Sequence, residues 1–228
     1  ARTRGFRGTL EIIPNGVDIQ HFTKTFSEAE LTAHKKQLGK KEGDVYLVTT
    51  SRLVHKNALD DVVRALALLP GHIHFLILGV GQEEHLLKKL AHELGVLEKI
   101  HFIGLVNHED MPIYLKVSDI FIRPSRSEGM GNSFIEAMAA GLPVIATQEG
   151  GLKDFLFDAQ KNPDKTTTGW AVEANNPKDI ARAVTEIIGN PGQVKKVIAN
   201  AQSMVREHYD WSLMSTLMRE KVFKRVLK

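Results

Sequence analysis

The sequence predicts an α/β fold with a Rossmann-like, doubly wound parallel sheet. Short apolar segments alternate with segments of helical character along most of the 228 residues. Several apolar segments are nearly continuous, which is typical of strands that are covered on both faces of a parallel sheet. Repeated strand–helix order gives that arrangement, because helices then pack on either side of one sheet.

Six short segments are expected to be the strands of this sheet. In chain order they are Val45–Thr50, His72–Leu78, Ile100–Ile103, Asp119–Ile122, Pro143–Ala146 and Gly169–Val172. Helices are expected over about Asn57–Leu69, Glu83–Leu94, Glu109–Lys116, residues 131–140 and Pro177–Ile188. Pro177 suits the first turn of a helix, where a missing N–H loses no hydrogen bond.

The predicted sheet lies within residues 26–190, which we expect to form one Rossmann-like domain. Residues 1–25 contain the turn signal Pro14-Asn15-Gly16 and are expected to connect from a preceding domain. Residues 191–228 are expected to form two extra C-terminal helices. The last begins near Asp210 and carries a broad apolar face made of Trp211, Met214, Leu217 and Met218.

Composition excludes several classes of protein. The chain has no cysteine, so it has no disulfide and no thiolate metal site. Its net charge of +3 is small for a nucleic-acid-binding domain, so we expect no nucleic-acid partner. No apolar run approaches the ~20 residues of a membrane span, and no signal peptide is visible. We therefore expect a cytoplasmic protein.

Basic residues gather near both ends of the chain. They are Arg2, Arg4 and Arg7 at the start and Lys221, Lys224, Arg225 and Lys228 at the end. Exposed, solvated termini explain them most simply. Weak peripheral contact with anionic lipid, which would bring the protein to the inner membrane surface, stays open.

Three loops that follow predicted strands carry the candidate chemistry, because ligands of open parallel sheets bind at the carboxyl ends of strands. The first loop places Arg52 and Lys56 where a strand gives way to a helix. Cations beside a helix N-terminus oppose its dipole. An anionic ligand such as a diphosphate would offset that cost; the alternative is that both are ordinary exposed charges.

The second loop, Leu78–Gln82, contains Gly79 and Gly81, which allow a tight turn and the close approach of a ligand. It does not continue as Gly-x-Gly-x-x-Gly, since Glu84 stands at the third glycine position. No acidic residue ends the following strand to hold a ribose. A dinucleotide-dependent dehydrogenase is therefore disfavoured.

The third loop is a glycine-rich turn that opens a helix, and it carries the strongest signal. The free N–H groups of such a turn, here Gly129, Met130, Gly131 and Asn132, bind anions. Glu128 lies in the turn, and Glu136 lies about two helical turns further on among apolar residues. Burying that carboxylate is costly without hydrogen-bond donors, which sugar hydroxyls would supply. The alternatives are a helix-dipole position for Glu128 and a salt bridge for Glu136.

Neither a metal ion nor a cofactor is expected. The chain has no Asp-x-Asp element that could clamp a diphosphate through a metal. Its histidines are scattered, without the helical pairing of a metalloenzyme. His55 and His108 lie in site-side loops and are expected to be surface residues rather than catalytic ones.

The residues around this turn resemble glycosyltransferase family 4, also called group 1, which has the two-domain GT-B fold. Glu128 and Glu136 have the E-x₇-E spacing of that family. Further similar segments, in the family's order, are Ile13–Asp18, Pro124-Ser125, Glu136–Ala139, Gly141–Val144 and Gly150-Gly151. The resemblance spans about Ile12 to Ile188 and implies that this chain is the C-terminal half of a GT-B enzyme.

The resemblance implies a role for each site residue in binding a nucleoside diphosphate sugar. Glu136 would hold the ribose hydroxyls, and Glu128 with the Gly129–Asn132 turn would hold the transferred sugar and the distal phosphate. Arg52, with Lys56, would stabilise the diphosphate leaving group. Val106 and Asn107 would contact the base through the main chain, and Gly79 and Gly81 would border the donor.

Two departures from the family pattern affect these roles. Asn57 stands where the family commonly has a lysine, so we assign contact with the phosphate to the neighbouring Lys56. Gly79-Val80-Gly81 stands where the family commonly has Gly-Asp-Gly. The resemblance also implies that the acceptor-binding N-terminal domain of such an enzyme lies outside this chain, so we expect a UDP-, GDP- or ADP-sugar to bind without transfer. A nucleotide-sugar epimerase of related fold and a non-catalytic nucleotide-sugar-binding module stay open as alternatives.

Overall fold

Six parallel strands form one sheet in the computed structural model, which describes residues 10–226. They are β1 Val45–Thr50, β2 Ile73–Leu78, β3 Ile100–Gly104, β4 Ile120–Arg123, β5 Val144–Ala146 and β6 Trp170–Ala171. Their order across the sheet is β3-β2-β1-β4-β5-β6, and every neighbouring pair is parallel. The predicted fold class is confirmed. The order reverses between β1 and β4, where such sheets bind their ligands.

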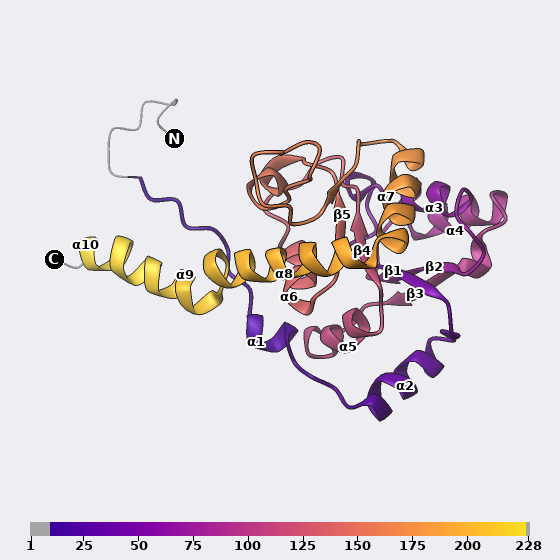
Figure 1. The fold of residues 1–228 in the computed structure, drawn as a ribbon, viewed down its shortest axis with the longest axis horizontal. Helices are drawn as coiled ribbons and strands as arrows, with labels where there is room; N and C mark the ends of the chain where they lie inside the picture. Colours follow the sequence, from indigo (N-terminus) through magenta and orange to yellow (C-terminus); the bar gives the residue numbers. More distant parts are fainter. Residues whose placement is uncertain (1–9, 227–228) are drawn as a thin grey trace.

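Helices cover both faces of the sheet (Figure 1). They include α3 Leu59–Leu66, α4 Glu84–Glu93, α5 Met111–Lys116, α6 Asn132–Ala140 and α7 Pro177–Gly189. Short 3₁₀ turns, η2 His55–Asn57, η3 Leu97–Lys99, η4 His108–Asp110 and η5 Gly150–Asp154, lie between them. Alternate residues of each strand face opposite sides, so Tyr46 joins the core beneath α5 and α6, and Leu47 joins the core beneath α3 and α7.

The helix expected from Asn57 to Leu69 is shorter in the structure. The segment begins as the 3₁₀ turn η2, and α3 starts only at Leu59. Ala58 separates the two because its backbone is left-handed, with φ of 55°. That conformation is unfavourable for a residue with a β-carbon, and the periodic apolar pattern does not reveal it. The predicted helix start was therefore wrong.

Within the described residues, two helices precede β1, and neither was predicted from the sequence. Helix α1, Ile19–Phe22, is capped by Asp18, and α2, Glu28–Gln37, begins with a capping box between Ser27 and Glu30. No residue of α2 is fully buried, so it lacks the apolar stripe by which helices are recognised. The Ser-x-x-Glu spacing is the signal that could have located it.

The described part of the N-terminal connecting segment packs against the C-terminal helices. These helices are α8 Pro191–His208 and α9 Trp211–Met218, followed by a π-helical turn, η6 Arg219–Phe223, and α10 Lys224–Val226. The Val17 N–H donates to the Tyr209 carbonyl at 2.8 Å, and the Trp211 N–H donates to the Val17 carbonyl at 3.0 Å. Phe22 lies in the core with 1% exposure. The division at residues 25 and 190 stays a prediction.

The last helices, from α9 to α10, extend beyond the body of the molecule (Figure 1). Lys224 pairs with Glu220, and Arg225 pairs with Glu11. The other cluster of basic residues, Arg2, Arg4 and Arg7, lies outside the described residues, as does Lys228. Across residues 10–226, no helix has both the length and the hydrophobicity of a membrane-spanning segment.

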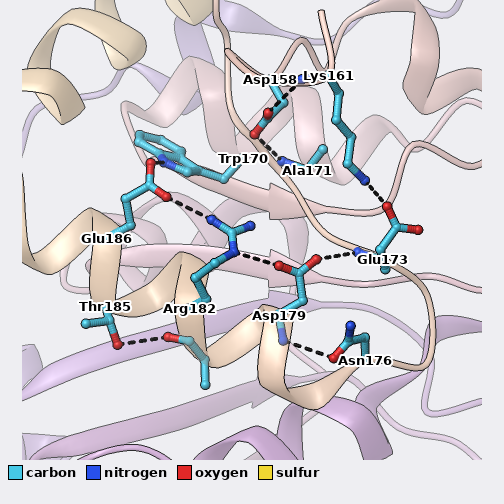
Figure 2. A network of polar contacts seen from close by, with 11 residues as sticks. Asp158, Lys161, Trp170, Ala171, Glu173, Asn176, Asp179, Arg182, Thr185 and Glu186 are labelled. Carbon is cyan, nitrogen blue, oxygen red and sulfur yellow. Dashed lines mark hydrogen bonds and ion pairs between the residues drawn. The ribbon is translucent and has the colours of Figure 1, made fainter.

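A polar network fastens the short edge strand β6 to α7 (Figure 2). The Trp170 Nε1–H donates to Glu186 at 3.0 Å, and Arg182 joins Glu186 and Asp179 at 2.9 and 2.7 Å. The Asp179 carboxylate also accepts the Glu173 N–H at 2.8 Å. These contacts stabilise the edge of the sheet that lies farthest from β3.

Candidate functional site

A cleft of about 310 Å³ opens at the carboxyl ends of β1 and β2, beside the start of α6. Its walls include Thr50, Ser51, Arg52, Gly79, Val106 and Glu136. The cleft adjoins the point where the strand order reverses, so it has the position that ligands occupy in open parallel sheets.

Four predicted site residues line this cleft together: Arg52, Gly79, Val106 and Glu136. Glu128 and the Gly129–Asn132 turn form the loop directly before Ser133, which is also part of the wall. Lys56, Gly81 and Asn107 belong to the bordering loops but do not line the cleft itself. The structure therefore gathers the predicted residues at one edge of the sheet, in two adjoining groups.

A larger hollow, of about 410 Å³, lies elsewhere, between the 157–168 loop and α8. Thr168, in its wall, immediately precedes β6, so the hollow lies at the amino end of that strand. Parallel sheets bind ligands at the opposite edge. We therefore place the candidate site in the smaller cleft.

Glu136 faces the cleft from α6 with its carboxylate only half-buried, while its helix neighbours Ile135 and Ala137 are fully buried. Burial raises the pKa of Glu136, and the charges of Arg123 and then His21 lower it in part. Within residues 10–226 no hydrogen bond or ion pair reaches its carboxylate. The salt bridge that was the alternative for Glu136 is therefore not formed in the described part of the chain.

Glu128 is turned toward the sheet and is held there. One carboxylate oxygen accepts a hydrogen bond from Arg123 at 2.8 Å, and the other accepts the Gly129 N–H at 2.9 Å. Its side chain is 11% exposed. The partner of this carboxylate is thus a buried guanidinium, rather than the helix dipole considered from the sequence.

Arg123 was not among the predicted site residues. It ends β4, and it also donates to the Thr50 carbonyl at 3.1 Å and lies over the Phe134 ring at 4.3 Å. Its signal in the sequence is a cation that directly follows the apolar run Ile120–Ile122, where an unpaired charge would be costly. The predicted strand ended at Ile122 and so left this residue out.

The glycine-rich turn leaves the start of α6 open to a ligand. Gly131 caps α6 in a left-handed conformation, with φ of 74°, and no side chain caps the helix. The first N–H groups of α6 are therefore available to an anion. Asn15 lies over the turn, since its N–H donates to the Met130 sulfur at 3.1 Å and its side-chain amide to Asn132 at 3.5 Å.

The two glycines after β5 let this turn approach closely. A β-carbon at Gly150 would lie 1.8 Å from the Glu128 carbonyl oxygen, and one at Gly151 would lie 2.4 Å from the Gly129 carbonyl oxygen. The Gly151 N–H donates to that same Gly129 oxygen at 2.7 Å. The absence of side chains at Gly150 and Gly151 thus lets the backbone of η5 pack directly against the backbone of the turn.

The loop after β1 presents two cations to solvent. Arg52 and Lys56 are exposed, and neither has an ion-pair partner within residues 10–226. Asn57 is 4% exposed and donates to the Arg52 carbonyl at 2.6 Å. The side chain at the position where the family often has lysine therefore closes the loop.

Arg126 ties this loop to the segment that carries Glu128. The backbone N–H of Arg126 donates to the Lys56 carbonyl, and its guanidinium donates to the His55 carbonyl, both at 2.8 Å. The guanidinium also binds Asp60 and Asp61 at 2.8 and 3.0 Å. The two loops that flank the start of α6 are thus held as one unit.

The loop expected to contact a base is anchored by stacked histidine rings. His21 of α1 lies 2.8 Å from the His108 carbonyl, and the two rings are 4.7 Å apart. His108 follows Val106 and Asn107, so this stack joins their loop to α1. Val106 lines the cleft, whereas Asn107 is exposed beside it.

The backbone packing around Gly79 and Gly81 explains why glycine occupies both positions, apart from any contact with a ligand. Gly79 has φ of 147°, and a β-carbon there would lie 1.9 Å from the Ser51 carbonyl oxygen. At Gly81 a β-carbon would lie 2.3 Å from the Leu53 carbonyl oxygen. The glycines therefore let the loops after β1 and β2 pack backbone to backbone at the cleft wall.

Gly79→Ala is expected to lower the free energy of unfolding by about 1–3 kcal/mol, because the new methyl group meets fixed backbone and φ is unfavourable. Urea unfolding followed by circular dichroism measures the change. Gly71→Ala is the matched control, since a β-carbon at Gly71 meets nothing within 4 Å and φ there is ordinary. Equal losses in both variants would contradict the packing role of Gly79.

A family model described as glycosyl transferases group 1 matches residues 31–204 of this chain. The chain is 29% identical over 221 residues to the GDP-mannose-dependent monoacylated alpha-(1-6)-phosphatidylinositol monomannoside mannosyltransferase of Corynebacterium glutamicum, which covers 92% of this chain and 55% of that protein. It is 25% identical over 199 residues to the alpha-monoglucosyldiacylglycerol synthase of Acholeplasma laidlawii, with 86% and 48% covered. The chain thus spans about half the length of these relatives.

Solved structures with the same fold include Anabaena Alr3699/HepE in complex with UDP and glucose. The TM-score is 0.84 at 21% identity, over 94% of this chain and 57% of that chain. The C-terminal domain of the group 1 family protein LpcC from Francisella tularensis gives a TM-score of 0.71 at 22% identity, over 86% of this chain and 99% of that chain. These likenesses agree with the Rossmann-like sheet described above.

Proposed function

This chain belongs to the glycosyl transferases group 1 family, and on that premise we propose that it is the donor-binding half of a retaining, metal-independent glycosyltransferase. The donor is a nucleoside diphosphate hexose, and the hexosyl group passes to an acceptor held by another domain. The observation that carries this proposal is Glu136, a half-buried carboxylate that faces the cleft without a hydrogen-bond partner in residues 10–226. Assignment to family 4 in particular stays a prediction.

The proposed ligand matches the chemistry around the cleft. A carboxylate accepts hydrogen bonds from a pair of neighbouring hydroxyls, so Glu136 suits the ribose of a nucleotide. Arg52, Lys56 and the open N-terminus of α6 lie on the side where a diphosphate would follow. Glu128 and the Gly129–Asn132 turn would hold the sugar and the distal phosphate. Val106 and Asn107 would contact the nucleotide base.

The proposed mechanism depends on stabilising the leaving group. When the sugar–phosphate bond breaks, negative charge grows on the diphosphate and the sugar becomes oxocarbenium-like. In this proposal Arg52, Lys56 and the N–H groups of α6 stabilise that charge, and removing one such donor typically costs about 2.7–4 kcal/mol of transition-state stabilisation. We propose that the acceptor attacks from the face the diphosphate leaves, which retains the configuration.

The relatives named above suggest which donors to test first. One is named for GDP-mannose, and one neighbouring structure was solved with UDP and glucose. We propose that this chain binds GDP-mannose, UDP-glucose or a related hexose donor, and calorimetric titration with each, together with ADP-glucose, tests the proposal. A folded chain that binds none of them would contradict the proposed function.

The acceptor domain is proposed to dock near the C-terminal helices. Trp211 and Met218 are exposed there, at 65% and 38%, beside a hollow of about 270 Å³ that Pro14 and Met214 also line. Exposed apolar patches of this kind mark interaction sites. The expected cytoplasmic location and weak membrane contact stay predictions.

Neutralising either cation of the loop after β1 should weaken the binding of the phosphates. Arg52→Gln and Lys56→Gln are each expected to weaken binding of the nucleoside diphosphate about tenfold, because a charge-assisted contact is lost, and to leave binding of the free nucleoside unchanged. Calorimetry with UDP and uridine, or GDP and guanosine, measures both. Lys195→Gln on α8 is the matched control, since Lys195 is exposed and belongs neither to the cleft wall nor to the loops that border it. Equal losses for nucleotide and nucleoside would contradict the phosphate role.

A further inference from the structure

Arg123 is a buried charge whose partners belong to the end of β1, the glycine-rich turn and α6. Its side chain is 7% exposed. Nη2 donates to Glu128 and Nη1 donates to the Thr50 carbonyl, whereas Nε has no partner within residues 10–226. A guanidinium this deep is a poor source of stability, because removing it from water costs much of what its ion pair returns. Its position therefore calls for a reason other than stability.

The contacts of Arg123 connect three parts of the site, namely the end of β1, the glycine-rich turn and α6. Thr50 ends β1, Glu128 lies in the turn, and Phe134, whose ring lies 4.3 Å from the guanidinium, belongs to α6. The turn is also bonded to Gly151 through the Gly129 carbonyl and to Asn15 through the Met130 and Asn132 side chains. Arg123 is the side chain that joins the turn to both β1 and α6.

The charge of Arg123 also matters for an anionic ligand. Glu128 and Glu136 would place two negative charges beside a diphosphate, and like charges in a partly buried site repel strongly. The charged or titratable groups that face Glu136 are Arg123 from β4 and His21 from α1, with Arg52 and Glu128 in the bordering loops. Of the two that lower the pKa of Glu136, Arg123 has the larger effect.

We propose that Arg123 is a positioning residue of the donor site. It holds the Glu128 carboxylate, the end of β1 and the start of α6 in one arrangement, and its charge allows both carboxylates to lie beside an anionic nucleotide sugar. Arg123 acts through Glu128 and Glu136, which are the groups expected to meet the ligand. This inference rests on the proposed function and adds to it the residue that sets the geometry of the pair.

Two variants separate the geometry from the charge. Arg123→Met removes both the fork of donors and the charge, whereas Arg123→Lys keeps the charge and loses the fork. Arg182→Met is the control, because Arg182 of α7 is also an ion-paired arginine, with Asp179 and Glu186 (Figure 2), but it does not line the cleft. A His21→Gln variant shows which part of any titration near neutral pH belongs to that imidazole.

Readouts on the unliganded chain test the arrangement directly. In Arg123→Met the amide hydrogen of Gly129 should exchange at least about tenfold faster, because the Glu128 carboxylate that accepts it is released. The NMR titration midpoint of the Glu136 carboxyl carbon should rise. Arg123→Lys should show the faster exchange with a midpoint near that of the native chain, and Arg182→Met should change neither.

Titration with UDP-glucose, UDP, GDP-mannose and GDP then tests the consequence for binding. Arg123→Met should weaken the binding of the nucleotide sugar at least about tenfold. This loss of affinity should grow as pH rises and Glu136 ionises. Native exchange at Gly129 with a native Glu136 midpoint in folded Arg123→Met would overturn the proposal. If that variant does not fold, Arg123→Lys decides through Gly129 exchange alone. If no nucleotide binds the native chain, the proposed function fails, while the unliganded readouts still decide whether Arg123 positions the carboxylates.

Discussion

The isolated chain is expected to bind its donor and yet transfer no sugar. All the loops that carry the candidate site lie between β1 and α7, within residues the structure describes. Catalysis also needs the acceptor hydroxyl to be held beside the anomeric carbon, and such positioning can supply about 7–11 kcal/mol of the barrier. The chain spans about half the length of its relatives, and the proposed function assigns the acceptor to another domain.

Incubation of the chain with its best-binding donor and candidate acceptors, followed by mass spectrometry of the acceptors, measures this outcome. Binding without glycosylated product is the expected result, and adding a matching acceptor domain in trans is the positive control. Steady turnover by the isolated chain would show that an acceptor site lies within it. The exposed face of Trp211 and Met218 is also expected to promote self-association, so the assay is run over a range of protein concentrations.

Replacing Glu136 is expected to weaken donor binding and to stabilise the fold at the same time. Glu136→Ala should lose about 1.5–3 kcal/mol of binding free energy, which is the range for hydrogen bonds to a charged group. Glu136→Gln keeps the shape of the side chain without the charge and should show part of that loss. Calorimetry with the best-binding nucleotide sugar measures both.

The gain in stability follows from the direction of the pKa shift. Because burial raises the pKa of Glu136 in the folded chain, the unfolded chain gives up this proton first. Native stability from this group is therefore full below the ordinary glutamate pKa of about 4.3 and is lost as pH rises through the folded-state value. Glu136→Gln has no such loss, so its free energy of unfolding, relative to the native chain, should increase from pH 4 to pH 7.

Urea unfolding at several pH values measures this difference, and Glu149→Gln is the matched control, since Glu149 is exposed and precedes η5. Residues of functional sites often lower the stability of the fold while they strengthen ligand binding. Unchanged donor affinity in a more stable Glu136→Gln would leave Glu136 as a buried charge without a role in binding.

The sheet was predictable because its signal is local and repeated. Runs such as Val45–Thr50 are apolar over their whole length, and each predicted strand is present within two residues of its expected bounds. Arg123 extends β4 by one residue, although a charged residue at the end of an apolar run argues against a strand. Helix α2 was missed for the converse reason, since it has caps but no buried face.

The sequence predicted that the candidate residues would gather at one edge of the sheet, but it did not predict Arg123 or the contacts among them. The spacing of Glu128 and Glu136 located both carboxylates, yet only the folded chain shows that Glu128 has a partner and that Glu136 has none within residues 10–226. The Arg123–Glu128 contact depends on how the turn folds back over β4. The inward position of Asn57 likewise depends on the left-handed Ala58 that follows it.

A crystal structure of this chain with the nucleotide sugar that binds best tests the central claim most directly. The ribose hydroxyls are expected within hydrogen-bond distance of the Glu136 carboxylate, with the diphosphate between Arg52 and the N–H groups of Gly131 and Asn132. The Arg123–Glu128 contact should be unchanged. Nucleotide bound in the hollow between the 157–168 loop and α8, with the cleft beside Glu136 free, would contradict the claim that this cleft is the donor site.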